Sequence, residues 1–352
     1  MTADILAWVL LAVVAAYACA GGADYGAGFW DLFAGGADRG RRPRWLIDHA
    51  MAPVWETNNV WLIFVLVILW TGFPVLFETV FSAMWLPLAL AAVGLVLRGA
   101  GFALRKPTRS LAQRRVYGAV FAVSSLVTPF FLGAAVGGLV TGRVRPGTGA
   151  SADAWSNPTS VIAGLITIAA TAFLGAVFLA ADARRFDAPD LVGYFRLRAW
   201  YALAAAAVLA GVGLRVTRDD ARYVHDGLTS GAGLALVLAA AVCGLATAAL
   251  LYRALTGWAR LTAAASVVLV VFAWGVATRP YFLPTSLTVA QAAGAATALR
   301  WLMLVSGVAL VLIGPPLVLL YRLDTRGVLQ PLTETDLRQT PSAAADRDSD
   351  AR

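Results

Sequence analysis

Long apolar runs, separated by short polar connections, set the pattern of this chain. A helix needs about 20 mostly apolar residues to cross a bilayer, and nine runs approach or exceed that length. Each run therefore predicts one membrane-spanning helix. The runs cover residues 5–33, 60–77, 83–97, 116–140, 161–181, 199–214, 231–251, 261–277 and 299–321.

Composition agrees with this pattern. The chain has 352 residues, of which 60% are hydrophobic and 14% charged, and its mean hydropathy is +0.74. So little charge cannot cover the surface of a soluble domain, which predicts an all-α polytopic membrane protein. We expect one transmembrane domain over residues 1–325. Residues 326–352 have no apolar period and predict a disordered cytoplasmic tail.

The basic residues are distributed unequally between the two sets of connections. Cytoplasmic connections of membrane proteins are enriched in Lys and Arg, so the side with 21 of the 28 is predicted to be cytoplasmic. This places the N-terminus outside and the C-terminus inside, as nine spans require. The net charge of +8 is spread over short connections without a basic groove, which argues against nucleic-acid binding. The minority side holds Arg143, Arg145, Arg215, Arg218, Arg222, Arg279 and Arg300.

Polar side chains are concentrated where the second run begins. Glu56 and Asn59 stand three residues apart and share one helix face, while Trp55 and Asn58 share a neighbouring face with Leu62. Ionisable residues at the mouth of a span are costly in lipid and suggest a functional site. The alternative is that Glu56 only stabilises the start of its helix through the helix dipole.

Two further charged residues are predicted at the same depth as Glu56. Asp24 lies on a face of small residues at the end of the first run, and Arg98 follows the third run. Three charged groups from three spans could form a structural ion-pair cluster, or the cytoplasmic entry of a proton path with Glu56 as the relay acid. Asp31 lies nearer the next connection and is predicted to be interfacial.

Haem ligation within this chain is not supported by the positions of its histidines. His49 and His225 are the only two, and both fall in connections rather than in the middle of a span. Cys19 and Cys243 have neither metal-ligand nor haem-attachment spacing. No cofactor is therefore expected in this chain.

Several motifs together resemble subunit II of the cytochrome bd quinol oxidases. The stretch from Trp55 to Leu62 resembles the family signature W-D-G-N-x-V-W-L, and Asp24 to Gly28 resembles the end of D-G-F-D-x-G-x-G. Arg98 to Arg105 is similar to R-G-x-x-F-E-x-R, and Pro280 to Thr288 to P-x-x-x-P-S-S-L-T. Each match is weak alone, but their order along nine runs is specific.

The resemblance implies a fold of nine transmembrane helices that includes two four-helix bundles. It also implies a heterodimer in the bacterial inner membrane, with a subunit I that carries haems b and d. Such a complex oxidises quinol and reduces O₂ to water. Subunit II would stabilise subunit I, contact lipid and quinone, and supply a proton path through Glu56. Asp24, Asn58, Asn59, Arg98 and Trp55 would support that path.

This chain departs from the family pattern at several acids. Glu56 replaces an Asp, Gly21 stands where the first acid of D-G-F-D is expected, and Ala103 replaces the acid of the arginine-rich motif. These changes indicate a divergent branch. They leave open a structural membrane subunit without oxidase activity, and a secondary transporter is a further alternative. The lack of matched broken helices in two halves argues against the transporter.

Overall fold

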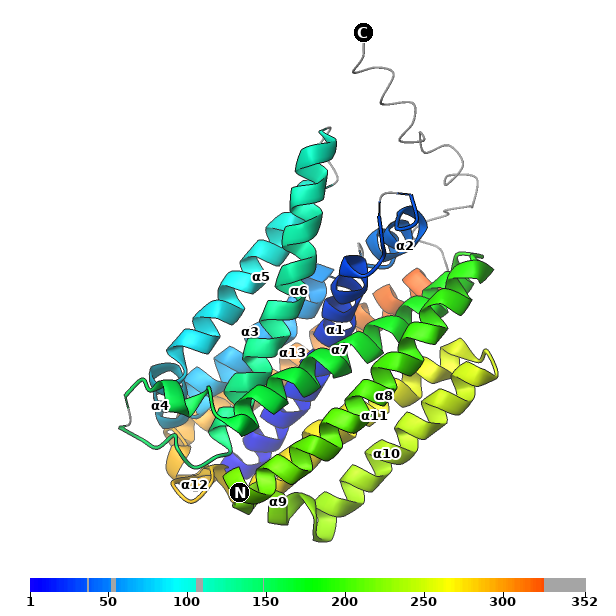
Figure 1. Ribbon diagram of the computed structural model, residues 1–352. Coiled ribbons are helices and arrows are strands. Elements are labelled where there is room, and N and C mark those ends of the chain that lie inside the picture. The colour runs from blue at the N-terminus through cyan, green and yellow to red at the C-terminus, as the bar shows by residue number, and fades with distance from the viewer. Residues whose placement is uncertain (37, 52–54, 106–109, 148, 326–352) are drawn as a thin grey trace.

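Helices form almost all of the computed structural model, which describes residues 1–36, 38–51, 55–105, 110–147 and 149–325 (Figure 1). Within these ranges, a few side chains, including those of residues 55–57, lie outside the description. The predicted tail, residues 326–352, lies outside it as well. The long helices are α1 (Thr2–Leu32), α3 (Trp55–Gly72), α5 (Trp85–Arg105), α6 (Leu111–Leu139), α7 (Pro158–Arg185), α8 (Pro189–Asp220), α10 (Gly231–Tyr252), α11 (Thr256–Thr278) and α13 (Ala296–Thr325).

Short elements connect the long helices. A two-stranded antiparallel hairpin, β1 and β2, joins α11 to α12. Thr288 closes the start of α12 with a capping box, in which Gln291 is the partner. The short elements are α2 (Arg41–Met51), α4 (Pro74–Ala83), η1 (Ala152–Ala154), α9 (Arg222–Leu228), β1 (Tyr281–Leu283), β2 (Leu287–Thr288) and α12 (Val289–Ala292).

The described residues contain eight helices that are long and apolar enough to cross a membrane, and a ninth if a bent pair counts as one span. That pair is α3 and α4, which meet at an angle of 116°. The run predicted over residues 60–77 is therefore not one continuous helix, because α3 ends at Gly72 and α4 begins at Pro74. Pro74 opens α4, and Phe73 before it has φ −134° and ψ 61°, because a residue that precedes proline avoids helical geometry.

The third predicted run also differs from the structure. It was expected over residues 83–97, with Arg98 in the connection after it, whereas α5 continues to Arg105. Arg98 is consequently a buried residue within a long helix, only 3% exposed. The arginine is buried because side chains of neighbouring helices cover it.

Helix α7 is the most enclosed span, and α1 crosses it at a point of close backbone contact. A Cβ atom added to Gly26 would collide with the Thr171 carbonyl and lie 2.8 Å from the Cα of Gly175. Glycine at both positions lets the two backbones approach, as small residues do in membrane helices. Gly22, one turn earlier, has more room, since its nearest neighbour is a Leu174 methyl group at 3.1 Å.

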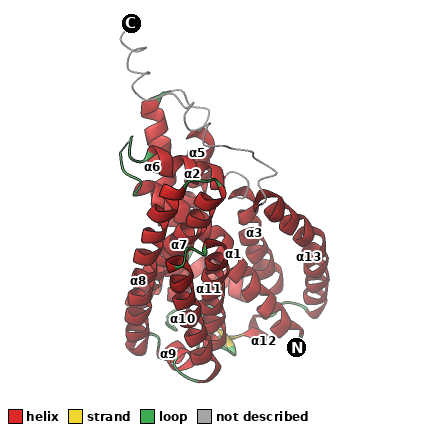
Figure 2. Cartoon of the chain, turned by 90° about the vertical axis from the view of Figure 1, so that its right-hand side faces the viewer, coloured by secondary structure: helices red, strands yellow, loops and turns green. Residues whose placement is uncertain are grey.

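Different short elements lie at the two ends of the bundle. Figure 1 shows α2 at one end, and α4, α9, α12 and the N-terminus at the other. Figure 2 shows α13 at the edge of the bundle, next to α3 and away from α8 and α10. The polar cluster described next is therefore built by helices α1, α3, α5 and α6, away from the α8–α10 edge.

Candidate functional site

Asp24 and Asn58 meet between α1 and α3. The Asn58 side-chain amide donates to the Asp24 carboxylate over 2.6 Å and to the Ala20 carbonyl over 3.2 Å. Asp24 is only 6% exposed, so its carboxyl group is removed from solvent and lipid alike. A buried carboxyl group needs such a partner, and the amide fixes one of its oxygens in a defined direction.

Arg98 lies beside this pair and is held by α6 and by aromatic rings. Its Nε donates to the Ser125 hydroxyl over 3.2 Å. Its guanidinium carbon lies 4.8 Å from the centre of the Tyr25 ring and 5.3 Å from that of Phe121. Its Nη2 is buried and has no hydrogen-bond partner among the described residues. These contacts stabilise a buried cation through the faces of two rings and leave one N–H group available.

Asp24 and Arg98 interact electrostatically, but no ion pair within 4.0 Å joins them. The arginine therefore compensates the charge of the carboxyl group without occupying it. This arrangement differs from a closed salt bridge, because the arginine does not occupy the carboxylate oxygens, one of which accepts from Asn58. The polar groups thus form a connected cluster over α1, α3, α5 and α6.

The structure brings together three of the six residues singled out from the sequence, namely Asp24, Asn58 and Arg98. Asn59 is half-buried on α3 and makes a contact of its own. Trp55 and Glu56 begin α3, so their backbone lies within two turns of Asn58, while their side chains lie outside the described part of the chain. The role of Glu56 stays a prediction.

A second charged cluster lies at the α2 end of the bundle and was missed by the sequence reasoning. The Asp31 side chain is 2% exposed and accepts from Arg44 over 2.8 Å and from Arg105 over 2.5 Å. Arg105 also lies 3.6 Å from Asp48 of α2. Asp31 is covered because α2 folds over the end of α1, and its place at the membrane interface stays a prediction. One signal was present, since Asp31 follows Asp24 by seven residues and shares its face.

Other buried charges pair elsewhere between spans. Asp182 of α7 and Arg260 of α11 are 2.5 Å apart, and Arg260 also donates to the Phe178 carbonyl. At the other end, Asp220 accepts from Arg143 and from the backbone and hydroxyl of Thr159. These contacts fix neighbouring helices to one another.

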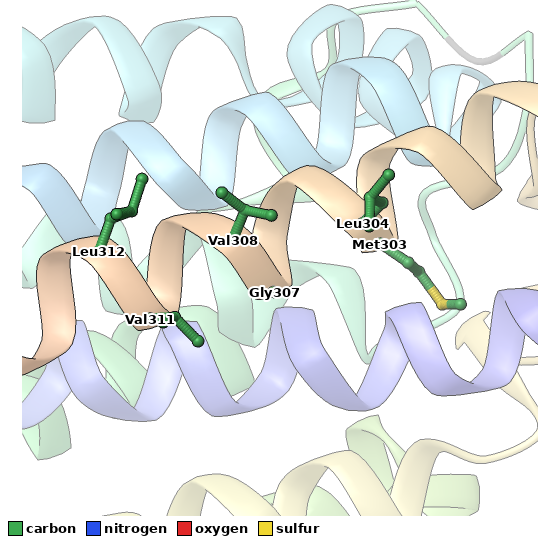
Figure 3. Close-up of a pocket in the computed structure, with 6 residues that line it drawn as sticks. All are labelled: Met303, Leu304, Gly307, Val308, Val311 and Leu312. Atoms are coloured by element: carbon green, nitrogen blue, oxygen red, sulfur yellow. The ribbon is translucent and has the colours of Figure 1, made fainter.

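Neither the histidines nor the surface grooves suggest another site. His49 on α2 contacts the Trp45 carbonyl, and His225 on α9 lies 3.4 Å from the Thr217 hydroxyl, at opposite ends of the bundle (Figure 1). Among the residues that the structure describes, no group of three His, Cys, Asp or Glu could hold a metal ion. An open apolar groove of about 500 Å³ lies along α13. Figure 3 shows the residues that line it, Met303, Leu304, Gly307, Val308, Val311 and Leu312.

The fold and the cluster define the chain as a multi-span helical membrane protein that buries an acid, an amide and an arginine between its spans. Residues 2–324 match the family model described as cytochrome bd terminal oxidase subunit II. The chain belongs to that family.

Individual relatives agree with this membership. Subunit 2 of the cytochrome bd-I ubiquinol oxidase of Escherichia coli (strain K12) is 29% identical over 136 residues, which is 38% of this chain and 35% of that protein. Subunit 2 of the cytochrome bd ubiquinol oxidase of Bacillus subtilis (strain 168) is 30% identical over 112 residues, 32% of each chain. The alignments thus span about a third of these curated relatives.

The fold has a solved counterpart as well. A chain in the structure of bd oxidase from Geobacillus thermodenitrificans superposes with a TM-score of 0.75 and 24% sequence identity. The match covers 92% of this chain and 98% of that one. The likeness shows that the two chains share one fold over nearly their full lengths.

Proposed function

We propose that this chain is the haem-free subunit II of a bd-type terminal quinol oxidase in the bacterial inner membrane. The complex would oxidise quinol and reduce O₂ to water. In this proposal a second subunit, subunit I, carries haems b and d, and residues 1–325 form one transmembrane domain that stabilises it. Family membership over residues 2–324 and the shared fold support this assignment.

The haems are assigned to the partner because the described residues of this chain do not fit them. A haem b iron needs axial ligands near the middle of a span. The two histidines lie on the short helices α2 and α9, outside the spans, and both are engaged in local contacts. The chain would therefore contribute to turnover through protons and assembly rather than through electron transfer.

The Asp24–Asn58 hydrogen bond is the observation that carries the proton-path proposal. It places an acid inside the bundle, with one oxygen fixed by the amide and with Arg98 near enough to stabilise its charge. Glu56 begins the helix that carries Asn58, so we assign it the first relay step, followed by Asp24. Asn59 and Trp55 would support this entry. An ionisable side chain buried between membrane spans suggests a functional site, and we assign this one to a proton relay.

Protons would enter from the cytoplasm. The side with most of the basic residues is the side of α2, and the positive-inside rule assigns it to the cytoplasm, with the N-terminus outside. We also propose that the spans form the two four-helix bundles implied by the family. Lipid and quinone would contact the outer faces of the bundles.

A second candidate is a structural subunit without its own proton path. The Asp31 cluster favours it, because both oxygens of that acid are occupied by arginines and hold three helices together. This reading accounts for Asp31 but not for Asp24, which has a hydrogen-bonded amide and no ion pair.

The test uses Glu56→Gln and Asp24→Asn in the assembled two-subunit complex. Each variant keeps the shape of its side chain and removes the proton-carrying group, so we expect oxygen consumption with quinol to fall about tenfold, with the haem spectrum intact. Asp219→Asn is the control, since that side chain is 72% exposed at the end of α8. Full turnover in both the Glu56→Gln and the Asp24→Asn variants would favour the structural subunit.

A further inference from the structure

Two tyrosines of α1 meet beside the Asp24 cluster and have no role in the path described so far. The Tyr17 and Tyr25 hydroxyl groups lie 2.9 Å apart, although the residues are eight positions apart on one helix. Their rings therefore point toward each other along the helix surface. Tyr25 is 3% exposed and Tyr17 is half-buried, so the hydrogen bond lies inside the protein.

Gly21 makes room for this pair. A Cβ atom added to Gly21 would lie 2.9 Å from Cε2 and 3.4 Å from Cζ of Tyr17. The hydroxyl-bearing end of that ring thus covers the site where a longer side chain at position 21 would extend. Position 21 is also where the signature D-G-F-D has its first acid and this chain has none. The Tyr17 ring thus lies against the position from which the family's acid would extend.

Arg98 connects the tyrosine pair to Asp24. Its guanidinium group lies over the Tyr25 ring at 4.8 Å and acts electrostatically on Asp24 as well. Its buried Nη2 has no partner among the described residues, and buried charged N–H groups are normally satisfied by protein or by ordered water. A cation in this position also stabilises negative charge that develops on a tyrosine oxygen during proton transfer.

We infer that the Tyr17–Tyr25 pair is the relay step after Asp24, joined to it by a water molecule on Nη2 of Arg98. This inference rests on the proposed proton path and extends it by two residues. The water passes a proton from the Asp24 carboxyl group to one hydroxyl, and that hydroxyl gives its own proton to the other. The second hydroxyl gives its own proton to a water molecule on the side away from Asp24, so both tyrosines end neutral and one proton has moved from Asp24 past the pair.

Tyr17→Phe and Tyr25→Phe test the step, because each removes one oxygen and keeps the ring that Arg98 and Gly21 contact. We expect each to lower quinol-driven oxygen consumption by about tenfold and to raise its solvent deuterium isotope effect. The double variant should be no slower than the slower single variant, since the two hydroxyls act in series. Tyr201→Phe is the control, because that side chain is 65% exposed on α8. Haem content per complex should stay unchanged throughout.

A relocated acid provides the converse test. Tyr17→Ala opens the space over Gly21, and Gly21→Asp then places a carboxyl group there. We expect Tyr17→Ala alone to be slow and Tyr17→Ala with Gly21→Asp to regain most of the lost turnover. Tyr17→Ala with Gly21→Asn should stay slow, because the amide can form a hydrogen bond but cannot carry a proton. Wild-type turnover in both Phe variants, or losses that only follow haem content, would overturn the inference.

The same experiments separate this inference from the wider proposal. If the tyrosines are not in the path but the path exists, Asp24→Asn is slow while both Phe variants turn over normally. If the chain carries no proton path, Asp24→Asn, Glu56→Gln and both Phe variants all turn over normally. Each pattern is distinct in one set of oxygen-consumption measurements.

Discussion

Asp24 and Asp31 lie on the same helix face, two turns apart, and their partners give them different roles. Asp24 accepts from a neutral amide and has an arginine nearby without an ion pair. Asp31 has an arginine on each oxygen. Asp31 therefore holds α1, α2 and α5 together.

Removing the charge of Asp31 should therefore destabilise the protein. Asp31→Asn leaves Arg44 and Arg105 without their carboxylate in a covered site, at a cost of about 3 kcal/mol. We expect a lower melting temperature of the detergent-solubilised complex, with turnover per intact complex retained. Asp190→Asn is the matched control, because the Arg42–Asp190 pair is 40% and 51% exposed and such pairs contribute little. Equal melting temperatures for Asp31→Asn and wild type would contradict this role of Asp31.

The sequence predicted Asp24, Asn58 and Arg98 for a physical reason. Charged and amide groups within or beside apolar runs are rare and costly, so they stand out without a structure. Asp31 and Arg105 did not stand out, because both lie next to connections where charge is ordinary. Their contact spans 74 residues and depends on how α1 and α5 end together, which no local pattern encodes.

At the scale of elements, the crossing of α1 and α7 determines how the site helices are placed. Helices in lipid pack through small residues rather than through hydrophobic burial, so glycine positions set the approach. The spacing of small residues in α1 predicted such a face, and the structure shows its tightest point at Gly26 opposite Gly175. The sequence could not identify the opposing glycine, since α7 contains small residues on several faces.

Gly26→Ala is predicted to disrupt this crossing. The added methyl group would enter the Thr171 carbonyl and the Gly175 backbone, which cannot shift without separating the helices. Overpacking of this kind costs about 3 kcal/mol, so we expect a reduced yield of assembled complex in detergent. Gly211→Ala on α8 is the control, because nothing lies within 4 Å of its added Cβ. Equal yields of both variants would show that α1 and α7 can move apart without loss.

The break between α3 and α4 is a feature that the sequence did not predict. Residues 60–77 are almost all apolar and were predicted to form one span, although they contain Pro74. Many membrane helices accommodate proline with a modest kink. Here the chain turns by 116°, and the Gly72 carbonyl accepts from the Gly294 N–H instead of continuing the helix. Gly294 lies more than 200 residues away along the chain, so no local sequence pattern predicts how far the chain turns.

For the whole molecule, the direction of insertion decides whether the proton path can work as proposed. The Asp24 cluster and the Asp31 cluster lie toward the α2 end, so protons from the cytoplasm reach Asp24 only if that end faces inward. The excess of basic residues on the same side predicts this orientation. The proton path therefore requires the orientation that the charges of the connections predict.

Cysteine labelling in intact cells measures the orientation. With Cys19 and Cys243 replaced by serine, Ala150→Cys lies in the exposed connection before α7, and Leu255→Cys lies between α10 and α11 at the arginine-rich end. We expect a membrane-impermeant maleimide to label residue 150 from outside the cell membrane and residue 255 only after permeabilisation. Labelling both sites after permeabilisation controls for their reactivity. The reverse pattern would place the Asp24 cluster near the outer surface, where it could not take up cytoplasmic protons.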